Sequence, residues 1–244
     1  MPSRETGNGR LPIYLRIQDA LTAEIARGAW RPGDALPSED ALARDFGVAL
    51  GTVRKALGAL AAEGKLDRRQ GRGTFVRRPD FGNAMFRFFR HADADGVPLR
   101  PTARLLARRR TRADAGIAAK LGLARGDELL ELFRVRLIDG EPILAEEIAL
   151  DARRFAPLAA LPADAFGDLL YPTYERVCGA AVARASEIIR FDRAATRVAK
   201  ALGVARDAPV AAIERTAFAI DGAPLEFRRS YGPAERFAYA LELK

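Results

Sequence analysis

The sequence has little of several residues on which common kinds of protein depend. Its one cysteine, Cys178, excludes a framework of internal disulfides and a multi-cysteine zinc site. Its one histidine, His91, excludes a histidine-rich metal site and argues against a histidine-based catalytic triad. No apolar run approaches the length of a membrane span, and the polar first ten residues predict no secretory signal. We therefore expect a cytoplasmic protein that needs neither a metal nor another cofactor.

The sequence does have an excess of positive charge, and most of it is concentrated in one short segment. The 244 residues carry a net charge of +8. Residues 54–78 hold eight basic and two acidic residues, which is a net charge of +6. A basic segment of this kind is often only a solvated surface, but it also suits a polyanionic partner.

The segment around this charge has the pattern of three helices and a hairpin. Apolar residues recur every fourth position over 13–25, which predicts an amphipathic helix. Ser38 is a good N-cap for a second, short helix, and Gly47 is expected to end it. A third helix is expected to begin within residues 49–52. Residues 65–76 then predict two short strands around a Gly-x-Gly turn.

Short motifs run through residues 36–76 in a fixed order. They are Leu36-Pro37-Ser38-Glu39, Leu42-Ala43, Phe46-Gly47-Val48, Thr52-Val53-Arg54-Lys55-Ala56-Leu57, Glu63-Gly64 and Arg69-Gln70-Gly71-Arg72-Gly73-Thr74-Phe75-Val76. In order and spacing they resemble the winged helix-turn-helix of the GntR family of transcriptional regulators. The resemblance implies that residues 1–78 form a DNA-binding domain whose third helix enters the major groove of a double-stranded operator.

The resemblance also implies roles for single residues. On the third helix, Thr52 and Arg54 match positions that contact DNA, and Lys55 would contact phosphate. Arg54 can bind guanine or clamp a phosphate. The hairpin would contribute five consecutive residues, two of them glycines that let the backbone approach DNA closely: Arg69, Gln70, Gly71, Arg72 and Gly73.

Three departures from the family pattern lie next to these residues. Asp40 stands where the family usually has arginine, and Ala49-Leu50 stands where it usually has Ser-Arg. Gly51 replaces a larger residue and weakens the start of the third helix. Arg54 and the hairpin must then contribute more of the DNA-binding affinity. The alternative is a degenerate helix that binds no DNA.

The rest of the chain contains an internal repeat that follows a short linker, residues 79–84. Residues 119–143 and 200–225 share a Leu-Gly-x-Ala-Arg motif and then an Asp-Gly-x-Pro motif. Each copy predicts a helix, a turn, a strand, an Asp-Gly hairpin turn and a return strand. Two copies predict a pseudo-symmetric α+β domain with a mainly antiparallel sheet.

Residues 85–244 carry a second set of short motifs. They are Phe88-Phe89, Arg134-Val135-Arg136, Asp139-Gly140-Glu141-Pro142, Glu146, Leu170-Tyr171, Gly179, Glu187, Leu202-Gly203-Val204, Arg215, Asp221-Gly222, Pro224, Glu226, Tyr231 and Phe237. They resemble the UTRA domain of the HutC subfamily, whose fold is shared with chorismate lyase. The resemblance implies an effector-binding and dimerisation domain, and hence a homodimer.

Arg134 and Arg136 alternate on a predicted strand, so both point to one face, about 6.7 Å apart. They would make an anion pocket, or else they are two solvated arginines on an exposed sheet. If Asp139-Gly140 is a two-residue loop, Glu147 shares the arginine face, whereas an odd-length loop places Glu146 there. The family match favours Glu146 as an effector contact.

Further candidates for the effector pocket rest on the same resemblance. They are Arg90, Tyr171, Glu226 and Tyr231. Leu169 stands where family members often have serine, which argues against simply transferring a sugar-phosphate effector. Phe86, Phe88 and Phe89 lie near Arg90 and suit either a pocket wall or a core.

Together these features predict a ligand-responsive, homodimeric transcription factor, a repressor that a small anionic metabolite releases from its operator. The alternative is a catalytic protein of chorismate-lyase-like fold. The sequence offers no nucleophile paired with a base and no cofactor motif for it. Gly71-Arg72-Gly73 lies in a hairpin and lacks the third glycine of a dinucleotide-binding loop.

Overall fold

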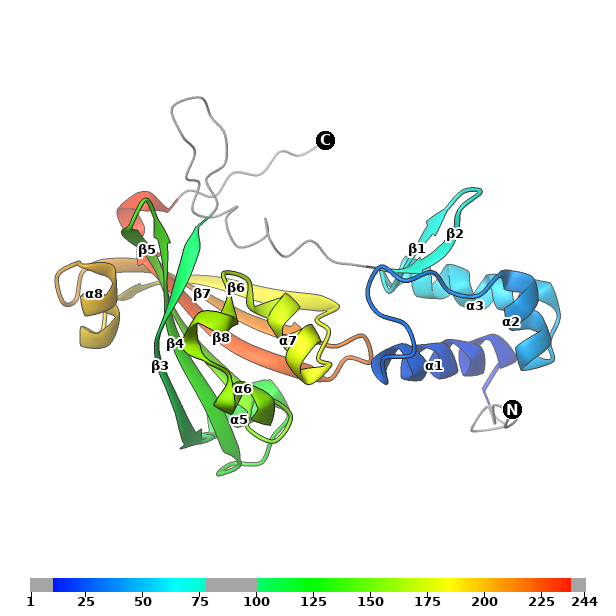
Figure 1. Cartoon of the computed structure of the whole chain (residues 1–244), viewed down its shortest axis with the longest axis horizontal. Coiled ribbons are helices and arrows are strands. Elements are labelled where there is room, and N and C mark those ends of the chain that lie inside the picture. Colours follow the sequence, from blue (N-terminus) through cyan, green and yellow to red (C-terminus); the bar gives the residue numbers. More distant parts are fainter. Residues whose placement is uncertain (1–10, 78–100, 238–244) are drawn as a thin grey trace. The chain divides into compact units, whose positions relative to one another are not determined.

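The structure, a computed structural model, describes residues 11–77 and 101–237. The described chain belongs to two compact units (Figure 1). The first contains three helices and a two-stranded hairpin, and the second contains a six-stranded sheet with helices on both faces. Within these two stretches, no helix is both long and apolar enough to cross a membrane.

Three helices of the first unit pack through apolar stripes. They are α1 (Ile13–Ala26), α2 (Glu39–Phe46) and α3 (Leu50–Ala62). The hydroxyl of Ser38 accepts a hydrogen bond from the backbone N–H of Ala41 at 3.2 Å, and so caps α2. Gly47 ends α2 in the left-handed conformation, with φ +63°. The predicted helices, cap and turn are confirmed.

The hairpin of the first unit is also confirmed. Strands β1 (Leu66–Arg69) and β2 (Gly73–Val76) are antiparallel, and their turn has positive φ at both Gly71 and Gly73. One contact was not predicted: the N–H of Leu36 donates to the carbonyl of Thr74 at 2.8 Å. The segment before α2 therefore anchors the hairpin to the helices.

The sheet of the second unit has the strand order β3-β4-β5-β8-β7-β6, and every neighbouring pair is antiparallel. Its strands are β3 (Thr102–Arg112), β4 (Glu128–Ile138), β5 (Glu141–Asp151), β6 (Arg184–Arg193), β7 (Pro209–Phe218) and β8 (Pro224–Pro233). The central strands β5 and β8 come from different copies of the repeat.

The predicted repeat is confirmed, and each copy has one more strand than the sequence predicted. The first copy runs β3, α5 (Ala115–Leu121), β4 and β5, and the second runs β6, α8 (Thr196–Leu202), β7 and β8. Glu146 pairs with Ser230, and Ile148 pairs with Arg228. An offset of 82 residues exchanges these two pairs, so a pseudo-twofold axis passes between β5 and β8.

The two Asp-Gly turns differ. Asp139 and Gly140 both have positive φ and form the expected two-residue hairpin turn. In the second copy, Phe218 pairs with Pro224, so Asp221-Gly222 belongs to a longer loop, residues 219–223. The prediction of equivalent turns in the two copies is wrong, because five residues separate the paired strand ends in the second copy and two separate them in the first.

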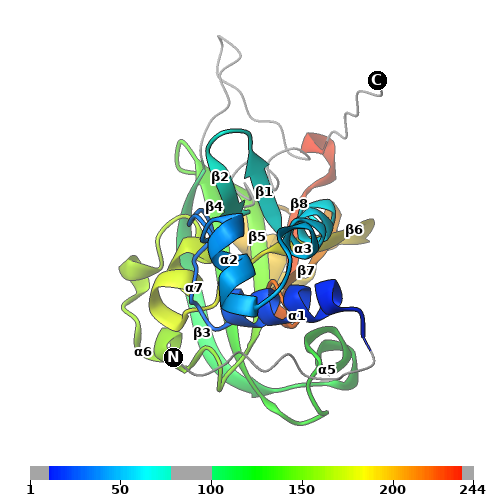
Figure 2. The same cartoon turned by 90° about the vertical axis from the view of Figure 1, so that its right-hand side faces the viewer.

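Different helices cover the two faces of the sheet (Figure 2). Helices α5 and α8 pack on the face that carries Phe133 and Phe227. Helix α7 (Leu170–Cys178) covers the opposite face; α6 (Ala156–Ala160) packs on α7, and the 3₁₀ turn η1 (Ala163–Phe166) contacts β3. A last 3₁₀ turn, η2 (Ala234–Arg236), follows β8. The face beneath α7 carries the buried charges of the sheet.

Candidate functional site

A basic surface on the first unit is formed by α3 and the hairpin, which contact each other. Arg54 and Lys55 are exposed on α3, and Thr52 is half-buried. Residues 69–73 of the hairpin are all exposed. The structure therefore gathers the residues predicted to contact DNA on adjoining parts of one unit.

Two cations of this surface lie over aromatic rings. Lys55 Nζ is 4.0 Å from the ring centroid of Tyr14, and the guanidinium carbon of Arg69 is 4.5 Å from that of Phe75. Arg69 also pairs with Asp67 at 3.0 Å. An aromatic ring orients a cation without neutralising it, so Lys55 keeps its charge for an anionic partner.

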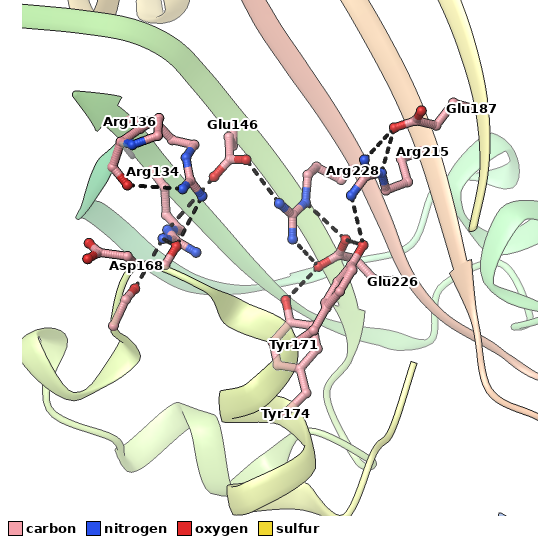
Figure 3. Close-up of polar contacts among 12 residues, drawn as sticks. Arg134, Arg136, Glu146, Asp168, Tyr171, Tyr174, Glu187, Arg215, Glu226 and Arg228 are labelled. Atoms are coloured by element: carbon pink, nitrogen blue, oxygen red, sulfur yellow. Dashed lines mark hydrogen bonds and ion pairs between the residues drawn. The ribbon is translucent and has the colours of Figure 1, made fainter. Parts of the chain in front are cut away.

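A second candidate site lies on the sheet face beneath α7 (Figure 3). Arg134 and Arg136 of β4 are 1% and 2% exposed. Arg134 donates to the carbonyls of Gly167 and Asp168 at 3.2 and 3.0 Å. Arg136 donates to the carbonyls of Asp168 and Pro101 at 3.0 and 3.3 Å. The alternative of two solvated arginines is therefore wrong.

Glu146 of β5 shares this face because of a β-bulge. Asp139-Gly140 is a two-residue loop, and continuing its register would place Glu147 on the face of Arg134. The register instead shifts by one residue next to Arg136, so that Glu146 pairs with Arg134. Glu146 thus lies on the arginine face, but the odd-length loop offered as the cause is wrong.

Arg228 of β8 links Glu146 to a second buried carboxylate. It donates to Glu146 Oε1 at 2.9 Å and to both oxygens of Glu226 at 2.9 and 2.7 Å. Tyr171 and Tyr174 of α7 donate to the same Glu226 at 3.1 and 2.7 Å. The three charged groups are nearly inaccessible, and their pairing offsets the cost of burying them.

The network continues across the sheet to its edge. Arg215 of β7 donates through Nε to Glu187 of β6 at 2.7 Å, and through Nη1 to the Tyr171 hydroxyl at 3.4 Å. Figure 3 shows the resulting chain of polar groups from β4 to β6. Tyr171 therefore joins Arg215 to Glu226 within the second copy, and Arg228 extends the network to Glu146 of the first copy.

Charge outweighs burial at Glu146. Burial by itself raises the pKa of the Glu146 carboxyl. The positive charges of Arg228, Arg134 and Arg136 outweigh that effect and lower the pKa to about 2. At neutral pH the site therefore presents a carboxylate among arginines.

Arg134 lines a pocket between β3 and the η1 turn. The other walls come from residues 103–105, 163–164 and 166–168. Nη1 of Arg134 and Oε2 of Glu146 are among the buried atoms of the described residues without a hydrogen-bond partner, and Glu146 Oε2 is in an ion pair with Arg134 Nε at 3.9 Å. Buried polar atoms without partners are costly. A ligand with an anionic acceptor for Arg134 and a hydroxyl or amine donor for Glu146 would satisfy both atoms.

Not every candidate from the sequence joins this cluster. Tyr231 lies on the opposite face from Glu226, because the two residues are an odd number apart on β8. Its hydroxyl donates to Glu147 at 3.4 Å, and its ring packs on the α8 cluster. The placing of Tyr231 in the pocket is thus corrected. The other candidates that are not seen in the cluster lie outside the described residues: Arg90, Phe86, Phe88 and Phe89.

Sequence reasoning missed Asp168, Tyr174 and Arg228. The repeat carried a signal for Arg228, because the offset of 82 residues that relates the two Asp-Gly motifs also relates Glu146 to Arg228. Asp168 and Tyr174 lie in the segment between the two copies of the repeat. The repeat therefore says nothing about them, and no other signal in the sequence marks them.

The two copies differ at the edge strand beside their arginines. Leu105 of β3 pairs with Arg134, as Glu187 of β6 pairs with Arg215. In the second copy, the carboxylate of Glu187 bonds the arginine. In the first copy the equivalent residue, Leu105, offers no carboxylate. Arg134 therefore has no carboxylate from the edge strand, and its nearest one is Glu146 of β5 at 3.9 Å.

The depressed pKa of Glu146 predicts how stability depends on pH. Because the folded pKa, about 2, lies below the unfolded value of 4.5, its contribution is complete above pH 4.5 and is lost as the pH falls toward 2. We expect the free energy of unfolding to fall between pH 6 and pH 3 by about 2 kcal/mol more in the wild type than in Glu146→Gln. Urea unfolding of both proteins at each pH measures this. Equal losses would contradict it.

Comparison with known proteins gives matches in both units. Residues 13–76 match the bacterial regulatory proteins of the gntR family, and residues 98–238 match the UTRA domain. The transcriptional repressor NagR of Bacillus subtilis is 30% identical over 94% of this chain and 93% of its own. The mannosyl-D-glycerate transport/metabolism system repressor MngR of Escherichia coli is 26% identical over 96% of each. The crystal structure of PhnF from Mycobacterium smegmatis is 29% identical, with a TM-score of 0.54 over 93% of this chain and 99% of PhnF.

Proposed function

Because the chain belongs to the GntR family of bacterial regulators and carries a UTRA domain, we propose that it is a transcriptional repressor that a small anionic metabolite releases from DNA. Its relatives are DNA-binding regulators rather than enzymes. One observation supports an anionic ligand: Arg134 lines a pocket, and its buried Nη1 has no hydrogen-bond partner among the described residues.

In this proposal residues 1–78 form the DNA-binding domain. Helix α3 enters the major groove, where Arg54 and Thr52 meet base edges or phosphates and Lys55 meets phosphate. The hairpin reaches the minor groove through Gln70 and Arg72. The exposure of Arg54, Lys55, Gln70 and Arg72 supports the assignment.

Residues 85–244 form the effector-binding and dimerisation domain, joined to the first by a linker at 79–84. The anion would meet Arg134 and Arg136, and a hydroxyl or amine would meet Glu146. Tyr171 and Glu226 would contribute indirectly, because both already bond within the network.

Hydrogen bonds join the pocket to residues 101–103, where the described part of the second unit begins. The carbonyl of Asp168 accepts hydrogen bonds from both arginines, and its side chain accepts one from the N–H of Ala103 at 2.7 Å. Arg136 also binds the carbonyl of Pro101. An anion that takes the place of the Asp168 carbonyl would disturb residues 101–103, at the start of β3. An effector can change DNA binding only if it binds the DNA-competent and DNA-incompetent arrangements with different affinity, and this disturbance would make the two affinities differ.

The proposed repressor acts as a homodimer in the cytoplasm. Two copies would present two α3 helices to half-sites about 34 Å apart on one face of the DNA. A palindromic operator is therefore expected.

Fluorescence anisotropy with a labelled duplex, selected by the wild type from a randomised pool, tests the proposal. We expect a palindromic duplex, affinity that falls steeply with salt, and release by at least one member of a panel of phosphorylated and carboxylated metabolites. Binding without sequence preference would refute the DNA-binding role. Affinity unchanged across the whole panel would refute the sensing role.

A further inference from the structure

One carboxylate ties the third helix of the first unit to its hairpin. Glu39, the first residue of α2, accepts a hydrogen bond from Arg54 Nε at 2.7 Å through one oxygen. Its other oxygen accepts one from Arg68 Nη2 of β1 at 2.6 Å. The carboxylate is 24% exposed, whereas the arginines are 59% and 46% exposed.

These pairs are poorly placed to serve stability. Exposed ion pairs typically contribute no more than about 1 kcal/mol, and the hairpin is already anchored through Leu36 and Thr74. The bonds instead fix the direction of two guanidiniums. The pair with Arg54 uses Nε, so the N–H groups of the two Nη atoms are left for a second acceptor.

A negative charge on a DNA-binding surface also has a cost, because it repels phosphate. That cost falls equally on every DNA sequence. The benefit of a fixed guanidinium depends on sequence, because bidentate binding to guanine requires one geometry. A carboxylate in this position therefore weakens indiscriminate binding and favours the duplex whose bases match the fixed arginine.

We infer that Glu39 is a positioning residue for DNA recognition: it holds Arg54 of α3 and Arg68 of β1 in one arrangement and thereby raises the preference for the operator over other DNA. The inference rests on the proposed DNA-binding function. Arg68, which the sequence did not single out, becomes a DNA-facing residue of the hairpin.

The test compares two neighbouring variants of the full chain, Glu39→Gln and Asp40→Asn. Each removes one negative charge, but no hydrogen bond or ion pair of the described residues joins Asp40 to Arg54 or Arg68. Anisotropy titrations at fixed salt use two duplexes, the selected one and a scrambled one of the same length. We expect Glu39→Gln to lower the ratio of the two affinities about tenfold. Asp40→Asn should tighten both and keep the ratio.

A third comparison separates positioning from folding. In an Arg54→Ala, Arg68→Ala background, Glu39→Gln should no longer change the ratio, and thermal unfolding should show all variants folded. The role of Glu39 is overturned if Glu39→Gln leaves the ratio unchanged, or if it lowers the ratio equally in the Arg54→Ala, Arg68→Ala background. Either result leaves the proposed DNA-binding function standing. A wild type that prefers no duplex refutes the proposed function, and the role of Glu39 with it.

Discussion

Replacing Arg228 by methionine is expected to lower the free energy of unfolding by about 3–5 kcal/mol. The guanidinium is the common partner of Glu146 and Glu226, and all three groups are buried. Removing it leaves two carboxylates close together in a medium that solvates them poorly. Urea unfolding of the full chain, followed by far-ultraviolet circular dichroism, measures the loss.

The next residue provides the matched control. Arg229 is on the opposite face, 44% exposed, and pairs with Glu214 at 3.1 Å. Arg229→Met is expected to cost no more than about 1 kcal/mol. Adding Glu226→Gln to Arg228→Met should recover part of the loss, because one uncompensated charge disappears. If the two methionine variants unfold alike, the buried carboxylates do not depend on Arg228.

The first unit could be predicted closely because its signals are local. A cap such as Ser38, and a helix end such as Gly47, act through bonds that span a few residues. The hairpin likewise follows from two glycines at positive φ. Its attachment to the segment before α2 could not be predicted, because that contact joins residues far apart in the chain.

The second unit was predictable in pattern but not in register. The repeat indicated two hairpins, and the sheet has them as β4–β5 and β7–β8, although their turns differ. A bulge then shifts β5 by one residue, which reverses the face that loop length alone predicts for Glu146. Bulges of this kind depend on packing on both faces, so turn residues alone do not reveal them.

The buried network was only partly predictable, for an energetic reason. Charged side chains are expected to be exposed unless partners are known, and the partners of Arg228 come from β5 and from its own strand. Burial of Arg228 therefore becomes predictable only after the register of β5 and β8 is fixed. The repeat could have supplied Arg228 as a candidate, but not its partners.

Replacing Arg134 by lysine is expected to abolish release of the operator at ligand concentrations that release the wild type. Lysine keeps the charge but lacks the planar fork. It cannot both bind the carbonyls of Gly167 and Asp168 and present a second nitrogen to an anion. We expect the ligand concentration for half-release to rise at least about 30-fold, as for other buried charged contacts. Operator affinity without ligand should change little.

Anisotropy of the labelled operator, titrated with a metabolite that releases the wild type, gives both quantities in one experiment. Arg229→Lys makes the same substitution on the other face and should respond as the wild type does. Thermal unfolding shows whether Arg134→Lys stays folded. A folded Arg134→Lys that is released at the wild-type concentration would place the anion elsewhere. Arg215 has the carboxylate of Glu187 within hydrogen-bond distance, whereas Leu105 gives Arg134 none and Glu146 approaches Arg134 only to 3.9 Å. Arg134 is for this reason the arginine that we propose as the partner of an external anion.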